Sequence, residues 1–112
     1  MLVFALAERL TARERRVLGA DSWSISSIVL WELAKLVQLG RLDLDLDHAD
    51  TVRTLSQLHV WPIDLDVALM STRLDFVGDP VDELIAATSV VHNVPLLTRD
   101  RRLRTSAMIP LA

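Results

Sequence analysis

Residues 79–100 decide the fold, and they read DPVDELIAATSVVHNVPLLTRD. Asp79 precedes a proline that suits the first position of a helix, and we interpret its side chain as the cap of that helix. The apolar residues that follow predict a helix over 80–92, which Asn93 ends. Residues 95–98 then predict a buried strand. A helix that leads directly into an apolar strand is typical of an α/β protein with a parallel sheet.

The same alternation of helices and strands extends over the rest of the chain. Further helices are predicted at 2–8, 11–18, 27–39, 47–58, 65–73 and 101–104, and further strands at 23–25, 60–63 and 108–111, with a strand or turn at 41–46. Together these elements predict a three-layer α/β/α sandwich around a small, mostly parallel sheet. The sequence contains no linker and no repeat, so we expect a single domain over 1–112.

The composition excludes several classes of protein. The chain has no cysteine, which excludes disulfides, zinc–thiolate sites and thiol catalysis. No apolar run reaches the roughly 18 residues that a membrane span needs, and we expect a cytoplasmic protein. The net charge of −3 is not typical of a nucleic-acid-binding protein, although a local basic patch is compatible with it. Eleven Asp against four Glu favour caps, turns or hard-metal ligands over helix surfaces.

Glu32 is the first candidate for a functional residue, because residues 28–34 are apolar on nearly every side of their helix. A buried carboxylate without a partner is costly, so Glu32 should meet a cation or a metal ion. The alternative is an ion pair with Lys35, or exposure on a narrow polar stripe of the helix. On the position of Glu32 alone we favour this alternative.

Asp82 and Asp100 are two further acidic candidates. Asp82 lies in the first turn of the 80–92 helix, where Glu83 could serve the helix dipole in its place. Asp100 follows the strand at 95–98, and the carboxyl ends of parallel strands are where open α/β sheets build their sites. Asp100 could equally cap the short helical turn behind it. Together with Glu32, these acids suit a hard divalent cation that prefers oxygen ligands.

Arg99, Arg101, Arg102 and Arg104 form a dense basic cluster beside Asp100. Such a run of charges is usually a solvated face on a short turn. The functional alternative is contact with phosphate groups, because guanidinium groups match phosphate with two parallel hydrogen bonds.

Four segments of the chain resemble successive motifs of PIN-domain ribonucleases of the VapC toxin type. They are 26–34 (SSIVLWELA), 39–42 (LGRL), 79–87 (DPVDELIAA) and 94–100 (VPLLTRD). The resemblance covers nearly the whole chain in order. It implies an endoribonuclease that uses Mg²⁺ or Mn²⁺, is held inactive by a cognate antitoxin and is commonly a homodimer.

The resemblance also implies roles for individual residues. Glu32, Asp82 and Asp100 fall on the acidic positions of the family, as catalytic residues and metal ligands, and Thr98 falls on the small hydroxyl beside the last of them. We therefore expect the three acids to converge in one site that binds RNA through Thr98 and the arginine cluster. Asp79 should lie at the rim of that site, bonded to backbone amides of its own helix.

The beginning of the chain departs from the family pattern. The family opens with a hydrophobic strand that ends in a metal-binding Asp, whereas residues 2–8 predict a helix and no acid precedes Glu8. We therefore expect a domain truncated at its N-terminus relative to the family and lacking the first strand. We expect this chain to have little or no ribonuclease activity, and an upstream strand ending in Asp to restore it.

Two other functions are compatible with the same residues. One is a catalytically inactive PIN-like module that only binds an antitoxin or a dimer partner, and the other is an acidic interaction domain whose carboxylates are only caps. An apolar helix over 2–10 would be costly to expose to water, so we expect the chain to associate with a second copy of itself or with an antitoxin. The antitoxin would then lie on Val3, Leu6, Leu10 and Leu18.

Overall fold

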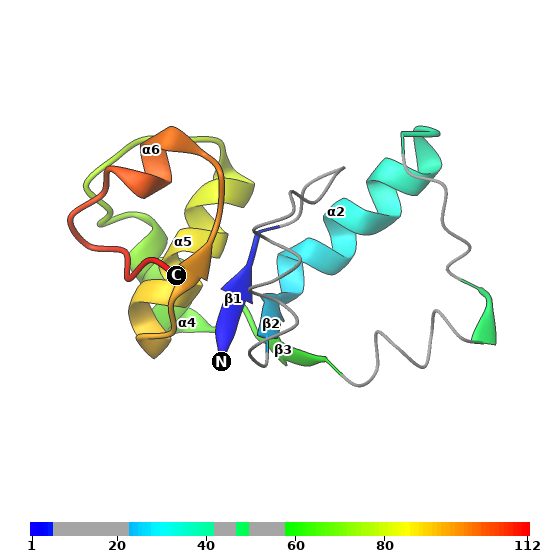
Figure 1. The fold of residues 1–112 in the computed structure, drawn as a ribbon, viewed down its shortest axis with the longest axis horizontal. Coiled ribbons are helices and arrows are strands. Elements are labelled where there is room, and N and C mark those ends of the chain that lie inside the picture. The colour runs from blue at the N-terminus through cyan, green and yellow to red at the C-terminus, as the bar shows by residue number, and fades with distance from the viewer. Residues whose placement is uncertain (6–22, 42–46, 50–57) are drawn as a thin grey trace.

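The computed structural model describes residues 1–5, 23–41, 47–49 and 58–112 (Figure 1). Its elements are β1 (Leu2–Phe4), β2 (Trp23–Ser26), α2 (Ser27–Gln38), β3 (His59–Trp61), α4 (Leu65–Ser71), α5 (Pro80–His92), β4 (Leu96–Leu97) and α6 (Arg101–Arg104). The predicted helices at 11–18 and 47–58 and the segment at 41–46 lie wholly or largely outside the described residues. Within the described part of the chain, no helix combines the length and apolar character that a bilayer crossing demands.

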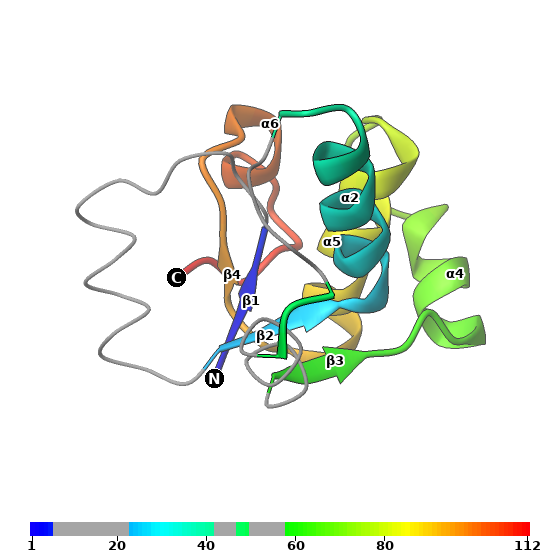
Figure 2. The same ribbon diagram turned by 90° about the vertical axis from the view of Figure 1, so that its right-hand side faces the viewer.

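Four parallel strands form the sheet, in the order β3-β2-β1-β4. In β1, Val3 pairs with Ser24 of β2 on one side and with Leu96 of β4 on the other. The predicted last strand contributes a single parallel bridge, from Leu111 to Leu96. Helices α2, α4 and α5 lie on one side of the sheet (Figure 2), and this arrangement confirms the predicted α/β class with a parallel sheet.

The N-terminal segment corrects one prediction. Residues 2–8 predict a helix and the absence of the first strand, but Leu2–Phe4 form a strand in the middle of the sheet. All three residues are buried, and Val3 is 0% exposed, because both faces of a central parallel strand are covered. A short apolar run cannot be assigned to helix or strand by its periodicity. Val3 therefore cannot lie on a surface for an antitoxin, and Leu6, Leu10 and Leu18 are outside the described residues.

Local sequence signals place the helix ends where they were predicted. The Ser26 hydroxyl accepts from the backbone N–H of the second residue of α2 at 3.4 Å, and Gly40 ends the segment with φ +70°. Asp64 caps α4 in the same way, at 3.0 Å from the Val67 N–H. Asn93 stops α5 in the left-handed conformation, with φ 51°.

The hydrophobic core lies between the sheet and its helices. Its buried members come from every strand but β3 and from α2, α5, α6 and the C-terminal segment: Val3, Phe4, Ile25, Val29, Ile85, Ala86, Leu96, Leu97, Leu103 and Ile109. Because this core holds β2, β4 and α5 in place, it also fixes the ends of those elements, where the acidic residues lie.

A buried hydroxyl links three strands. The Ser24 Oγ donates to the Leu2 carbonyl at 2.7 Å and accepts from the indole Nε1 of Trp61 at 2.8 Å. The Trp61 ring stacks on His92, with ring centroids 4.1 Å apart, and meets the ring of His59 edge-on at 4.1 Å. Ser24 in β2 thereby connects β1 to β3, and Trp61 connects β3 to α5.

Replacing this hydroxyl should weaken the sheet. Ser24→Ala removes both hydrogen bonds and leaves the Trp61 indole N–H without its acceptor, so we expect a loss of about 1–3 kcal/mol in the free energy of unfolding. Urea denaturation followed by circular dichroism measures the loss. Ser71→Ala is the control, because its exposed hydroxyl donates only within its own helix, to the Ala68 carbonyl, and should cost less than about 0.5 kcal/mol. Equal losses in the two variants would contradict the role of Ser24.

Candidate functional site

The predicted acids lie at the edge where the parallel strands end. Helix α2, which carries Glu32, follows β2 without a gap, and Asp100 follows β4 and begins α6. Asp79 and Asp82 lie at the start of α5, which runs back along the sheet before β4. Three segments that are distant in sequence therefore bring carboxylates toward one region of the molecule.

Glu32 is half-buried and lies among like charges. Burial is the main cause that raises its pKa to about 7, and the charges of Asp82 and Asp79 raise it further. The Oε1 atom of Glu32 is buried and has no hydrogen-bond partner among the described residues. Lys35, which the alternative interpretation pairs with Glu32, donates instead to Gln38 at 3.1 Å. The carboxylate is thus the kind of group that a cation would stabilise.

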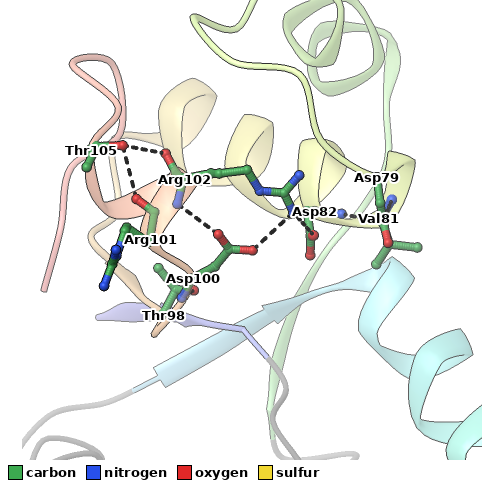
Figure 3. A network of polar contacts seen from close by, with 8 residues as sticks. All are labelled: Asp79, Val81, Asp82, Thr98, Asp100, Arg101, Arg102 and Thr105. Atoms are coloured by element: carbon green, nitrogen blue, oxygen red, sulfur yellow. Dashed lines mark hydrogen bonds and ion pairs between the residues drawn. The ribbon is translucent and has the colours of Figure 1, made fainter.

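Asp82 is the centre of the acidic group. Burial raises its pKa first, then the charges of Asp79 and Asp100, while the guanidinium of Arg102 opposes this rise. Arg102 Nη2 lies 3.6 Å from Asp82 Oδ2 and 3.4 Å from Asp100 Oδ2 (Figure 3). Because Asp82 interacts with Glu32 as well as with Asp100, it connects the acids of α2 and α6.

Asp79 has the expected role and a second one. Its Oδ1 accepts from the N–H groups of Val81 and Asp82, at 2.9 and 3.2 Å, which confirms the predicted cap. Its charge also raises the pKa of both Glu32 and Asp82. This electrostatic role was not predicted, although the spacing of three residues between Asp79 and Asp82 places them on the same turn of the helix.

Thr98 and Asp100 fix the turn that carries the arginines. The buried Thr98 hydroxyl accepts from the Asp100 N–H at 3.1 Å, and the Thr98 carbonyl accepts from Arg104 Nη1 at 3.1 Å. Asp100 Oδ1 accepts from the Arg102 N–H at 2.9 Å, so Asp100 does cap α6 while its other oxygen faces Arg102. Arg99 and Arg101 are exposed on the same turn. Thr98 thus lies inside the turn, and the arginines lie on its surface.

The acids suit a hard divalent cation by donor type and charge. All the donors are carboxylate oxygens, and burial and neighbouring charges destabilise the ionised forms of Glu32 and Asp82. Glu32 Oε1 has no hydrogen-bond partner in the part of the chain that the structure describes. In the described ranges no three acidic or histidine side chains are close enough to surround an ion by themselves. Strand β1 is followed by Ala5, which adds no carboxylate. Water would have to complete the coordination, as it usually does for Mg²⁺.

Comparison with known proteins agrees with this geometry. The model of the PIN domain family matches residues 2–107. Ribonuclease VapC22 of Mycobacterium tuberculosis (strain ATCC 25618 / H37Rv) is 32% identical over 98 residues, which are 84% of this chain and 75% of that protein.

Solved structures have the same fold at lower identity. FitAcB from Neisseria gonorrhoeae superposes with a TM-score of 0.72 and 18% identity, over 99% of this chain and 96% of that chain. A toxin-antitoxin complex from Klebsiella pneumoniae gives a TM-score of 0.69 and 20% identity, over 94% and 91% of the two chains. VapBC2 from Rickettsia felis bound to a promoter DNA fragment gives 0.66 and 18%, over 100% and 98%.

The raised pKa of Glu32 makes stability depend on pH. Because this pKa rises from 4.5 to about 7 on folding, the folded protein binds more protons between these values, and its free energy of unfolding falls as the pH rises through them. Glu32→Gln removes this loss. Its stability relative to the parent protein should therefore increase between about pH 5 and about pH 8, by on the order of 1 kcal/mol, since water screens a half-exposed carboxylate. Urea unfolding in the presence of EDTA measures the difference.

Asp75→Asn is the control, because the pKa of Asp75 is shifted in the opposite direction to that of Glu32. The Asp75 carboxylate accepts from the Ser106 hydroxyl and the Ala107 N–H, and these bonds lower its pKa from 3.8. Its contribution to stability is fully present above that value and is lost only at lower pH. Asp75→Asn should therefore change stability equally at about pH 5 and about pH 8. If the effect of Glu32→Gln on stability were equally constant between these pH values, it would contradict the raised pKa of Glu32.

Proposed function

The chain belongs to the PIN domain family, and from this membership we propose that it is a metal-dependent endoribonuclease toxin that hydrolyses RNA phosphodiester bonds and is neutralised by a cognate antitoxin. The observation that carries the proposal is the group of mutually repelling carboxylates around Asp82, at the edge where the parallel strands end. The ribonuclease to which the chain is 32% identical supports the same chemistry.

The carboxylates of Glu32, Asp82 and Asp100 are the proposed ligands of a Mg²⁺ or Mn²⁺ ion. Such an ion would supply an acidic bound water and would stabilise the charge of the leaving oxygen. Burial and neighbouring charge raise the pKa of Glu32 to about 7 in the free protein, and a bound cation would offset both by favouring the ionised carboxylate. Thr98 orients Asp100 through the Asp100 N–H.

The arginines on and beside α6 are the proposed contacts to the RNA backbone. Arg99 and Arg101 are exposed next to Asp100, where their guanidinium groups can hold the phosphates on either side of the bond that is cleaved. This local basic group explains how a chain of net charge −3 can bind a polyanion.

A protein antitoxin is the proposed partner, since the similar Klebsiella pneumoniae structure is described as a toxin-antitoxin complex. Large apolar side chains exposed on α2 and α4, Trp31 and Leu65 among them, offer contact area for this partner or for a second copy in a homodimer. We place the activity in the cytoplasm, where the RNA substrate is.

A catalytically inactive module that only binds its partner is the second candidate. The observation that favours it is the end of β1, where Ala5 stands at the place that the family resemblance assigns to a metal-binding Asp. Since β1 is present in the sheet, the described residues differ from the family pattern at this place by one carboxylate rather than by a whole strand.

The first test removes the central charge. In the Ala5→Asp chain of the second test, Asp82→Asn should lower Mg²⁺-dependent cleavage of RNA at least about 100-fold, because a displaced ion misaligns the reacting groups. Asp66→Asn is the matched control, since Asp66 occupies the first turn of α4 as Asp82 occupies that of α5, and it should leave cleavage intact. Asp79→Ala should mainly lower stability, by about 1 kcal/mol, through the lost cap. Unchanged cleavage by Asp82→Asn, in a fluorescence assay of labelled RNA, would refute the proposed site.

The second test adds a carboxylate at the end of β1. Ala5→Asp should raise cleavage by about 10-fold or more if the other ligands are in place, because a further oxygen ligand fixes the position of the ion. Ala5→Asn has nearly the same shape without the charge and should leave cleavage at the level of the parent chain. If neither the parent chain nor Ala5→Asp cleaves RNA, the inactive module is the correct assignment.

A further inference from the structure

Arg102 differs from the other arginines of its cluster in what it touches. Its guanidinium lies between the carboxylates of Asp82 and Asp100, whereas the Arg101 side chain is directed away from both (Figure 3). Arg104 is bound to the Thr98 carbonyl. A positive charge of this chain therefore already occupies the space between two of the proposed metal ligands.

The backbone of Arg102 is fixed by a short hydrogen bond, whereas its guanidinium group makes only long contacts. The backbone N–H of Arg102 donates to Asp100 Oδ1 at 2.9 Å, which fixes the base of the side chain. The contacts of the tip are 3.4 and 3.6 Å long, beyond the roughly 2.7–2.9 Å of a strong charge-assisted hydrogen bond, and the side chain is 54% exposed.

We propose that Arg102 is a competitor for the divalent ion: its guanidinium holds Asp82 and Asp100 in the free protein, gives them up when the ion binds, and is then taken up by the phosphate backbone of RNA. The inference rests on the proposed function of the same site. It follows that metal ion and RNA bind cooperatively, because each removes the group that hinders the other. A free toxin would thus bind its ion weakly and a toxin on its substrate would bind it well.

The first experiment measures the affinity for Mn²⁺ by isothermal titration calorimetry. Arg102→Gln should bind Mn²⁺ about fivefold or more tightly than the parent chain, since the competing charge is gone. Arg101→Gln removes the same charge from the same helix without freeing a carboxylate and should change the affinity less than about twofold. Equal effects of the two variants would overturn the inference and leave the proposed function standing. Weaker binding by Arg102→Gln would also overturn it, because Arg102 would then support the site.

The second experiment adds an oligonucleotide that cannot be cleaved. A short 2′-O-methyl RNA should tighten Mn²⁺ binding in the parent chain and have little such effect in Arg102→Gln. The reason is that the Arg102 guanidinium couples the binding of Mn²⁺ to the binding of RNA. Equal tightening in both proteins would overturn the inference. If neither the parent chain nor Arg102→Gln binds Mn²⁺, with or without the oligonucleotide, both the proposed function and the inference about Arg102 fail.

A third measurement needs no variant and covers the case in which Arg102→Gln does not fold. In the parent chain, the ¹⁵N NMR signal of the Arg102 Nε–H should move on addition of Mg²⁺ to the position of a freely solvated guanidinium. The Arg73 signal serves as the internal reference. A signal of Arg102 that stays in place while Mg²⁺ binds would overturn the inference.

Discussion

The parallel direction of all four strands is the constraint on which the site depends. Parallel strands end at one edge of the sheet, so the segments that leave β2 and β4 start from the same edge. Helix α5 must run back across the sheet before β4 can begin, and its N-terminus therefore lies at this edge as well. Glu32, Asp82 and Asp100 lie toward the same region because of this geometry, although long stretches of sequence separate them.

The proximity of these acids lowers the stability of the fold, and several local interactions offset part of this loss. The Asp79 carboxylate accepts a hydrogen bond from a free backbone N–H at the start of α5, and the Asp100 carboxylate does the same at the start of α6. Arg102 compensates part of the remaining charge from between two carboxylates. Burial first and the residual repulsion second raise the pKa of Glu32 and of Asp82. Such raised values are typical of a functional site that is kept at the expense of the free energy of folding.

The features that could be predicted from the sequence are the ones with local causes. Asp64, Asp79 and Asn93 define helix ends through groups within a few residues, and the structure agrees with each prediction. The three acids could be singled out by their placement in the chain and by the family resemblance, while their assignment as metal ligands stays a prediction.

The features that could not be predicted depend on partners that are distant in sequence. Strand β1 is only three residues long, and it is a strand because neighbours cover both of its faces, which no pattern within residues 2–8 reveals. Likewise, no local signal distinguishes Arg102 from Arg101, since the difference lies in the carboxylate of Asp82 on another helix. The bonds of Ser24 to β1 and β3 belong to the same class.

The pairing of β1 also has a consequence for the synthesis of the chain. Val3, near the start of the sequence, is the register partner of Leu96, near its end, and donates its N–H to the Pro95 carbonyl at 2.8 Å. One edge of β1 therefore stays open until the ribosome has released β4. Until then the nascent chain exposes an apolar strand with unpaired backbone groups, which is a template for association with other chains. For this small domain, the interval between the translation of β1 and that of β4 is therefore the period in which a chaperone or a newly made partner would protect it most.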